Sequence, residues 1–221
     1  MKNENILKFY LLATSLKNKI RQGSIYWNVQ GPRRESVAEH IYDTCILAIA
    51  IDSEYDLKID LKRVLEMLII HELEEIVIGD ITPFDNVTEQ EKLEIGKNAV
   101  LDILSSLTKK EDYIALTNEF NARETKEANF AHLCDKLDFD IQMKLYTDRG
   151  LISLDENYDS PVFKSGKIKE ILANGAKTPS DVFYEYDVNK YKDSNEFKSL
   201  LDYSYSIDLY ERLESCLKDI K

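Results

Sequence analysis

Apolar residues recur at three- and four-residue steps along most of the chain, which is the period of an amphipathic helix. The first such run covers 4–22, and Gly23 is predicted to end it. A capping box formed by Ser36 and Glu39 predicts the start of a second helix. The broad inward face expected for that helix consists of Val37, His40, Ile41, Thr44, Ala48 and Ile51. Between the two helices, residues 24–35 contain a Gly-Pro pair and are expected to be irregular.

The helical period continues to the end of the chain. Asp60 is a predicted N-cap of a helix that stops at Gly79, and Thr88 heads another that runs to about residue 107. Further helices are expected at 111–120, 123–146, 165–174, 179–187 and 194–220, with a loop at 151–163. No repeat and no long linker interrupts the pattern. We therefore predict an all-α helical bundle that forms a single domain over residues 1–221.

Composition agrees with this architecture. The 221 residues include only 7 glycines and 4 prolines, too few turn-formers for a many-stranded sandwich or barrel, while 43% are hydrophobic. The 41 acidic residues exceed the 29 lysines and arginines and give a net charge of −12. Such a surface repels a nucleic-acid backbone and an anionic membrane, so neither is an expected partner.

The cysteines and the N-terminal segment indicate a compartment. Cys45, Cys134 and Cys216 lie far apart and none is in CxxC spacing, so we expect neither a disulfide framework nor a zinc ribbon. The apolar N-terminal run is interrupted by Lys8 and Lys17 and has no cleavage site, so it does not resemble a signal peptide. A cytoplasmic protein in a reducing environment is predicted.

Histidines and acids interrupt the apolar faces at a few positions. His71 follows an apolar run directly, and on a continued helix it would share a face with Glu72 and Glu75. Carboxylates buried there without a partner would cost several kcal/mol, and a divalent cation would supply that partner. His40 lies on the inward stripe of the preceding helix, and Asp135 interrupts another apolar face.

Two imidazoles and two carboxylates suit Mn, Fe, Co, Ni or Zn better than Ca. Each residue alone also has an ordinary explanation. A buried histidine such as His40 is usually a hydrogen-bonded core residue, and an acid such as Asp135 usually lies on a solvated helix face. His132 is expected to be an ordinary surface or core residue, and a functional role for it is the less favoured interpretation.

Three segments together carry a family resemblance: ESVAEH at 35–40, HELEEIVIGDITP at 71–83 and DKLD at 135–138. They resemble the HD-domain superfamily, and within it the branch of the 5′-deoxynucleotidases, over residues 8–146. The resemblance implies an all-α HD domain, with residues 147–221 as a helical extension. It also implies hydrolysis of (deoxy)nucleoside 5′-monophosphates by a metal-activated water, and a homodimer.

The resemblance assigns roles residue by residue. The implied ligands of one divalent transition metal are His40, His71, Glu72 and Asp135. Glu75 and Asp80 match catalytic acids, and Arg21 matches the arginine that meets the substrate phosphate. Substrate contacts are further expected from Trp27 and Arg33, with Arg34 beside them on the same loop.

Three departures from the family pattern keep alternatives open. The metal-binding His-Asp doublet is His71-Glu72 here, Ser24 stands where the family has tryptophan, and the loop at 31–34 is two residues longer. The main alternative is a catalytically impaired protein that binds metal or nucleotide. Phosphodiester or alarmone hydrolysis is a further one, but a two-metal phosphodiesterase would need additional histidines, and only His132 is left to supply one.

Overall fold

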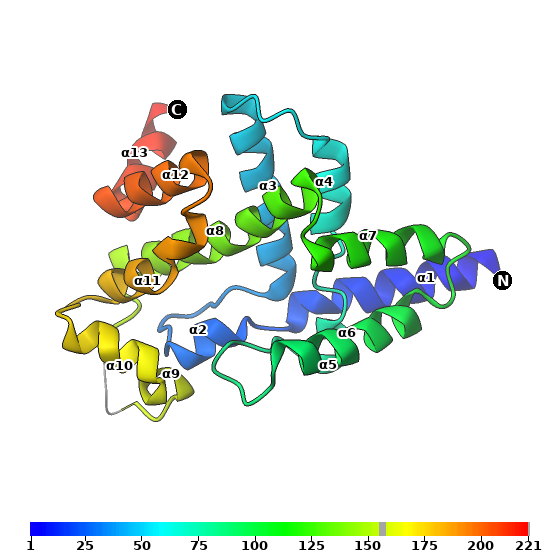
Figure 1. Cartoon of the computed structure of the whole chain (residues 1–221), viewed down its shortest axis with the longest axis horizontal. Helices are drawn as coiled ribbons and strands as arrows, with labels where there is room; N and C mark the ends of the chain where they lie inside the picture. Colours follow the sequence, from blue (N-terminus) through cyan, green and yellow to red (C-terminus); the bar gives the residue numbers. More distant parts are fainter. Residues whose placement is uncertain (155–157, 221) are drawn as a thin grey trace. The chain divides into compact units, whose positions relative to one another are not determined.

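The computed structural model describes residues 1–154 and 158–220, and within these ranges helices are the only extended regular elements. In chain order they are α1 (Lys2–Thr14), the 3-10 helix η1 (Ser15–Asn18), α2 (Gln22–Tyr26), α3 (Val37–Glu54), α4 (Leu61–Leu68), α5 (Glu75–Ile78), α6 (Glu89–Leu104), α7 (Lys110–Ala122), α8 (Lys126–Asp148), α9 (Pro161–Lys164), α10 (Gly166–Ala173), α11 (Pro179–Asp187), η2 (Val188–Tyr191), α12 (Asn195–Ser206) and α13 (Leu209–Asp219). Figure 1 shows them along the chain, and the predicted all-α class is confirmed. None of the helices in the described part of the chain is both long enough and apolar enough to cross a bilayer.

The chain clusters into two compact units. The first contains 1–22 and 35–135, and the second contains 23–34 and the described residues from 136 onward. The boundary at 135 falls inside α8, so this one helix begins in the first unit and ends in the second. That 1–221 forms a single domain stays a prediction.

The first unit is built around α3. Ser36 accepts a hydrogen bond from the Glu39 backbone and Glu39 reaches back, so the predicted capping box is present. The buried residues of α3 are the six expected from the sequence. This face packs on α4 and η1, while α7 packs against both α4 and α6, and α1 lies beside α6 (Figure 1).

The first predicted helix, 4–22, is wrong in extent. Helix α1 ends at Thr14 and buries none of its residues; the side chains of Ile6 and Tyr10 are 63% and 56% exposed. The apolar period thus identified a helix but not what covers it. Gly23 lies inside α2 instead of ending a helix, and a Cβ there would approach Phe139 Cε2 to 3.1 Å.

The predicted helix from Asp60 to Gly79 is broken in the middle. Asp60 caps α4 as expected and Gly79, with φ of 78°, ends α5, but 69–74 form turns. The turns are held by bonds of the 3-10 type, such as Leu73 N–H to Ile70 O. His71 supplies the reason for the break, because its Nδ1 lies 2.6 Å from the carbonyl oxygen of Leu68 and takes up an acceptor at the end of α4.

Two boundaries near the C-terminus also differ from prediction. Helix α9 begins within the loop expected at 151–163 and extends one residue past it, and 155–157 of that loop are outside the described residues. The single helix expected at 194–220 is split, because Asp208 accepts from Glu211 N–H and starts α13 anew. The helices expected at 111–120, 123–146, 165–174 and 179–187 are present within a few residues of their predicted ends.

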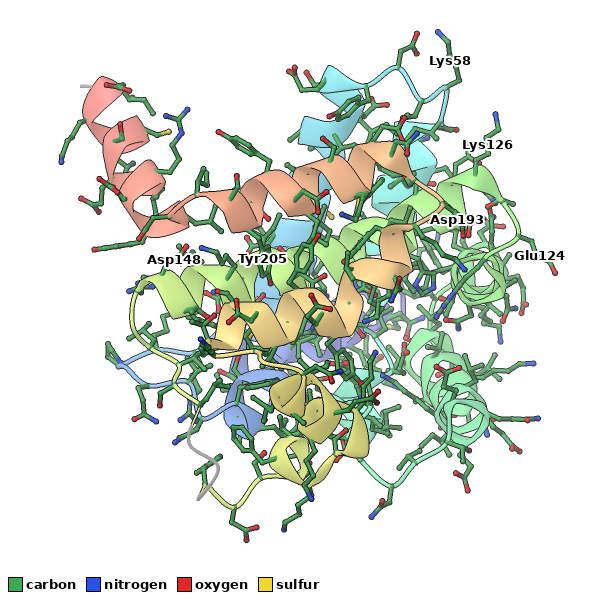
Figure 2. The ribbon with its side chains drawn as sticks, turned by 60° about the vertical axis from the view of Figure 1, so that its left-hand side comes forward. Lys58, Glu124, Lys126, Asp148, Asp193 and Tyr205 are labelled. Atoms are coloured by element: carbon green, nitrogen blue, oxygen red, sulfur yellow. The ribbon has the colours of Figure 1, made fainter. Side chains whose placement is uncertain are left out.

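The second unit has a core of aromatic rings and a buried polar cluster. Trp27 packs edge-on against Phe183, with ring centroids 4.4 Å apart. Asp140 of α8 accepts a hydrogen bond of 2.5 Å from the Tyr191 hydroxyl, and its backbone carbonyl accepts from Tyr205 of α12, which Figure 2 labels. The helical extension is thereby anchored on the second half of α8.

Candidate metal centre

Four side chains from three segments of the first unit converge on one buried point. His40 comes from α3, His71 and Glu72 from the turns after α4, and Asp135 from α8. Each offers one nitrogen or oxygen, and these four atoms all lie within 4.8 Å of one another. All four residues are less than 9% exposed. Interatomic spacing of this size is compatible with common ligation of one small cation.

His71 provides a test of whether a metal fits. Its Nδ1 is engaged by the Leu68 carbonyl, so Nδ1 carries the proton and Nε2 has a lone pair. Nε2 is buried and has no hydrogen-bond partner. A buried imidazole nitrogen without a donor is costly, and a metal-ligating histidine characteristically gives its other N–H to a carbonyl. The donor set and this nitrogen therefore fit a divalent transition metal.

Glu72 lies at the centre of the cluster and contacts both histidines and Arg21. Its Oε1 lies 3.4 Å from His71 Nε2, 3.6 Å from His40 Nε2 and 3.3 Å from Arg21 Nη1. Burial by itself would raise the pKa of this carboxyl, but the interactions with His71 and the charge of Arg21 outweigh it and hold the pKa well below the ordinary value. Glu72 is thus an anion at neutral pH, as a metal ligand must be.

Arg21 lies close to two acids, Glu72 and Asp80. Its Nε is 3.9 Å from Asp80 Oδ2, and Asp80 Oδ2 also accepts a 2.7 Å hydrogen bond from the Gln22 backbone N–H. Burial opposes the charge of the guanidinium, but the neighbouring carboxylates, Asp80 first and Glu72 next, raise its pKa above the ordinary value. A fixed cation therefore lies next to the candidate metal ligands.

Glu75 is the most deeply buried acid of the group, with 1% of its surface exposed. Burial, followed by the charges of Glu72 and Asp80, raises the pKa of Glu75 well above the ordinary value. Its Oε2 has no hydrogen-bond partner. The site thus holds two buried glutamates whose protonation preferences are driven in opposite directions.

The predicted substrate residues divide between the two units. Arg21 lies in the first unit, at the cluster, whereas Trp27 and Arg33 belong to the second. Trp27 is 3% exposed within the aromatic core of that unit, and Arg33 is exposed. Neighbouring Arg34 donates from Nε to the Val29 carbonyl. The substrate role of Trp27 and Arg33 stays a prediction.

His132 is not among the predicted site residues, yet it lies close to the cluster. Its Nδ1 is 4.0 Å from Asp135 Oδ2. The signal that could have found it is its spacing of three residues from Asp135 within one helix, which places both side chains on the same face.

Comparison with known proteins agrees with the metal-site geometry, because the chain matches a family of proteins with this arrangement of motifs. Residues 13–177 match the family model described as HD domain. The 5′-deoxynucleotidase HDDC2 of Danio rerio is 32% identical over 148 residues, which are 66% of this chain and 71% of that protein. The 5′-deoxynucleotidase HDDC2 of Dictyostelium discoideum is 29% identical over 180 residues, covering 73% of this chain and 94% of the relative.

Solved structures share the fold. A predicted metal-dependent phosphohydrolase from Magnetospirillum magnetotacticum is 28% identical, with a TM-score of 0.56 over 66% of this chain and 72% of its own. An HD-domain phosphohydrolase from Listeria innocua matches 97% of both chains with a TM-score of 0.64. At 18% identity this second likeness concerns the fold alone.

Proposed function

Because the chain belongs to the HD domain family, we propose that it is a metal-dependent phosphohydrolase that removes phosphate from nucleoside 5′-monophosphates, deoxynucleotides included. The observation that carries the proposal is the buried set of four ligand atoms with the Arg21 guanidinium beside it. A cation site next to a fixed arginine is suited to a phosphate ester, which needs its charge neutralised from two sides. The named relatives are 5′-deoxynucleotidases, which supports this substrate class.

The ligands we propose for one divalent metal are His40, His71, Glu72 and Asp135. Two nitrogens and two carboxylate oxygens favour Mn, Co, Fe, Ni or Zn. When bound, such a metal supplies Lewis acidity toward a phosphoryl oxygen and makes water a nucleophile near neutral pH.

We propose that Arg21 binds the phosphate of the substrate. Its guanidinium presents several N–H donors in a plane, which matches two phosphoryl oxygens. Asp80 holds it from one side, while the backbone N–H of Gln22 fixes the orientation of Asp80. The arginine is thus held in place before substrate arrives.

In this proposal the proton from the attacking water goes to Asp80, or through a second water to Glu75 in its ionised form, which its raised pKa makes a stronger base. The water oxygen forms a bond to phosphorus as the bond between phosphorus and the nucleoside 5′-oxygen breaks, and the proton taken from the water passes to that leaving oxygen. Inorganic phosphate and a nucleoside are the products.

We further propose that 1–221 acts as one HD-type domain in a cytoplasmic homodimer. The family model spans residues of both compact units, which supports a single domain. Helix α1 exposes a stripe of large apolar side chains, namely Ile6, Leu7, Tyr10 and Leu11, and such a stripe is characteristic of a protein interface. Light scattering of wild type beside Leu7→Glu tests the dimer.

The test of the function is a substrate panel. Phosphate release is measured from nucleoside 5′-mono-, di- and triphosphates, ribo and deoxy, each with Mn²⁺, Co²⁺, Ni²⁺ and Zn²⁺. Release from monophosphates that depends on added metal is the expected result. Turnover of di- or triphosphates alone, or none with any metal while metal is bound, would contradict it and favour the binding-protein alternative that the Glu72 departure raises.

A further inference from the structure

His132 of α8 is held on three sides within the first unit. Its ring stacks on Phe120, with centroids 4.1 Å apart and planes at 17°. Its Nε2 lies 3.0 Å from Arg123 Nε. Its Nδ1 faces Asp135 Oδ2 at 4.0 Å. The side chain is only 12% exposed, so this orientation is set by protein contacts.

The contact with Arg123 decides which ring nitrogen carries the proton. An arginine Nε–H can only donate, so His132 Nε2 must be the acceptor. In the neutral imidazole the proton then lies on Nδ1, the nitrogen that faces Asp135. An N–H group of His132 is thereby directed at a carboxylate oxygen.

The two oxygens of Asp135 face different histidines. Oδ1 lies 3.1 Å from His40 Nε2, on the side of the other candidate metal ligands, while Oδ2 faces His132. We propose that His132 is a positioning residue that holds Asp135 Oδ2 and so keeps Oδ1 directed at the metal, and that Arg123 sets the tautomer this requires. The inference rests on Asp135 being a metal ligand, as proposed above.

Local structure keeps Arg123 in place for this task. It is the C-cap of α7 and has a left-handed backbone, with φ of 55°. Its carbonyl accepts a 2.9 Å hydrogen bond from Asn129 Nδ2 on the first turn of α8. An arginine in a conformation that ordinarily favours glycine is therefore fixed between α7 and α8.

The separation of 4.0 Å between His132 Nδ1 and Asp135 Oδ2 exceeds a hydrogen bond, so the force between them is the attraction of an N–H dipole for a charge. In a buried setting of low dielectric this attraction is stronger than in water. Partners of metal ligands typically contribute about 10- to 100-fold to metal affinity.

The experiment measures the Kd for Mn²⁺ of the full chain, after chelation, by calorimetric titration. His132→Leu should raise Kd by about tenfold or more, because the donor is lost. His132→Asn places an amide N–H near the position of Nδ1 and should restore most of the affinity. Arg123→Met should weaken binding in the wild-type background but add nothing to His132→Leu.

Arg63→Met is the matched control. Arg63 is an exposed arginine that pairs with Glu119 of α7, the helix that Arg123 caps, and it takes no part in the cluster. Its removal should leave the Kd for Mn²⁺ unchanged. Melting temperatures of the metal-free variants separate loss of affinity from loss of fold.

The results separate two claims, the positioning role of His132 and the metal site itself. If wild type binds Mn²⁺ and His132→Leu binds it equally well, His132 is structural and the inference fails while the metal site stands. If His132→Leu does not fold, the exposed Arg123→Met decides, and a wild-type Kd in that variant overturns the inference. Wild type that binds no metal overturns both the ligand set and the positioning role.

Discussion

His40 and Asp135 are 95 positions apart in the sequence, yet His40 Nε2 lies 3.1 Å from Asp135 Oδ1. The first residue is fixed by the capped start of α3 and the second by the middle of α8. Their approach brings a carboxylate to His71 and Glu72, which lie in the turns after α4. It completes a set of ligands that none of the three segments holds by itself.

Removal of one ligand should greatly weaken metal binding. Wild type is expected to carry about one Mn²⁺ or Co²⁺ per chain, and His71→Ala far less, because three ligands hold a metal much more weakly than four. Metal at about 100 times its Kd should also stabilise wild type by about 2.7 kcal/mol, seen as a higher melting temperature. Elemental analysis after dialysis checks the stoichiometry. Glu66→Gln, at an exposed position on α4, is the control and should keep its metal. A His71→Ala protein with full metal content would refute the ligand assignment.

Arg21→Lys should lose phosphatase activity and keep its metal. Lysine preserves the charge but not the planar donors, so at least one charge-assisted hydrogen bond to phosphate, worth about 1.5–3 kcal/mol, is lost. The expected fall in kcat/KM is about 10- to 100-fold at unchanged metal content. Initial rates on a deoxynucleoside monophosphate measure it. Equal rates for the two proteins would make Arg21 a structural residue.

Glu72→Asp should lower activity, although it restores the ligand typical of the family. Glu72 Oε1 contacts Arg21 and both candidate histidine ligands at 3.3–3.6 Å, and a side chain shorter by one methylene withdraws that oxygen. Displacement by about 1 Å can cost a hundredfold in rate. The assay compares initial rates with saturating Mn²⁺. A gain of about tenfold from a nearly inert wild type would instead show that the chain is a binding protein that has lost catalysis.

Asp140→Asn should stabilise the protein at high pH. Burial, followed by the charge of Asp187, raises the pKa of Asp140 well above its ordinary value. The folded state therefore binds this proton more tightly than the unfolded state, and stability falls as pH rises from the ordinary aspartate pKa toward the raised one. Asparagine stays neutral and can still accept from Tyr191.

We expect Asp140→Asn to melt about 2–4 °C higher than wild type at pH 8, with a smaller difference at pH 5. Thermal denaturation followed by circular dichroism measures both values. Asp193→Asn, an exposed position in the same unit that Figure 2 labels, controls for the loss of one negative charge. A melting difference that does not change with pH would refute the raised pKa.

Local signals in the sequence determined where several helices begin and which residues of α3 face the core. The capping boxes at Ser36 and Thr88 and the N-cap at Asp60 fixed where three helices begin, and the six buried residues of α3 followed from their spacing. These features depend on residues within one or two helical turns of each other, so they can be predicted from the sequence alone. The motifs at 35–40 and 71–83 likewise indicated which side chains to consider for a metal.

Tertiary structure decided what depends on distant partners. Helical spacing continued through 69–74, but the ring of His71 competes for the Leu68 carbonyl and ends α4 there. The stripe on α1 predicted burial, but no residue of this helix is fully buried, and Ile6 and Tyr10 are mostly exposed. His132 had only a spacing to suggest a role, and its tautomer is set by Arg123, a residue of the preceding helix end. Periodicity records which face of a helix is apolar, whereas the hydrogen-bond partner of a buried polar atom is chosen by the segments that packing brings to it.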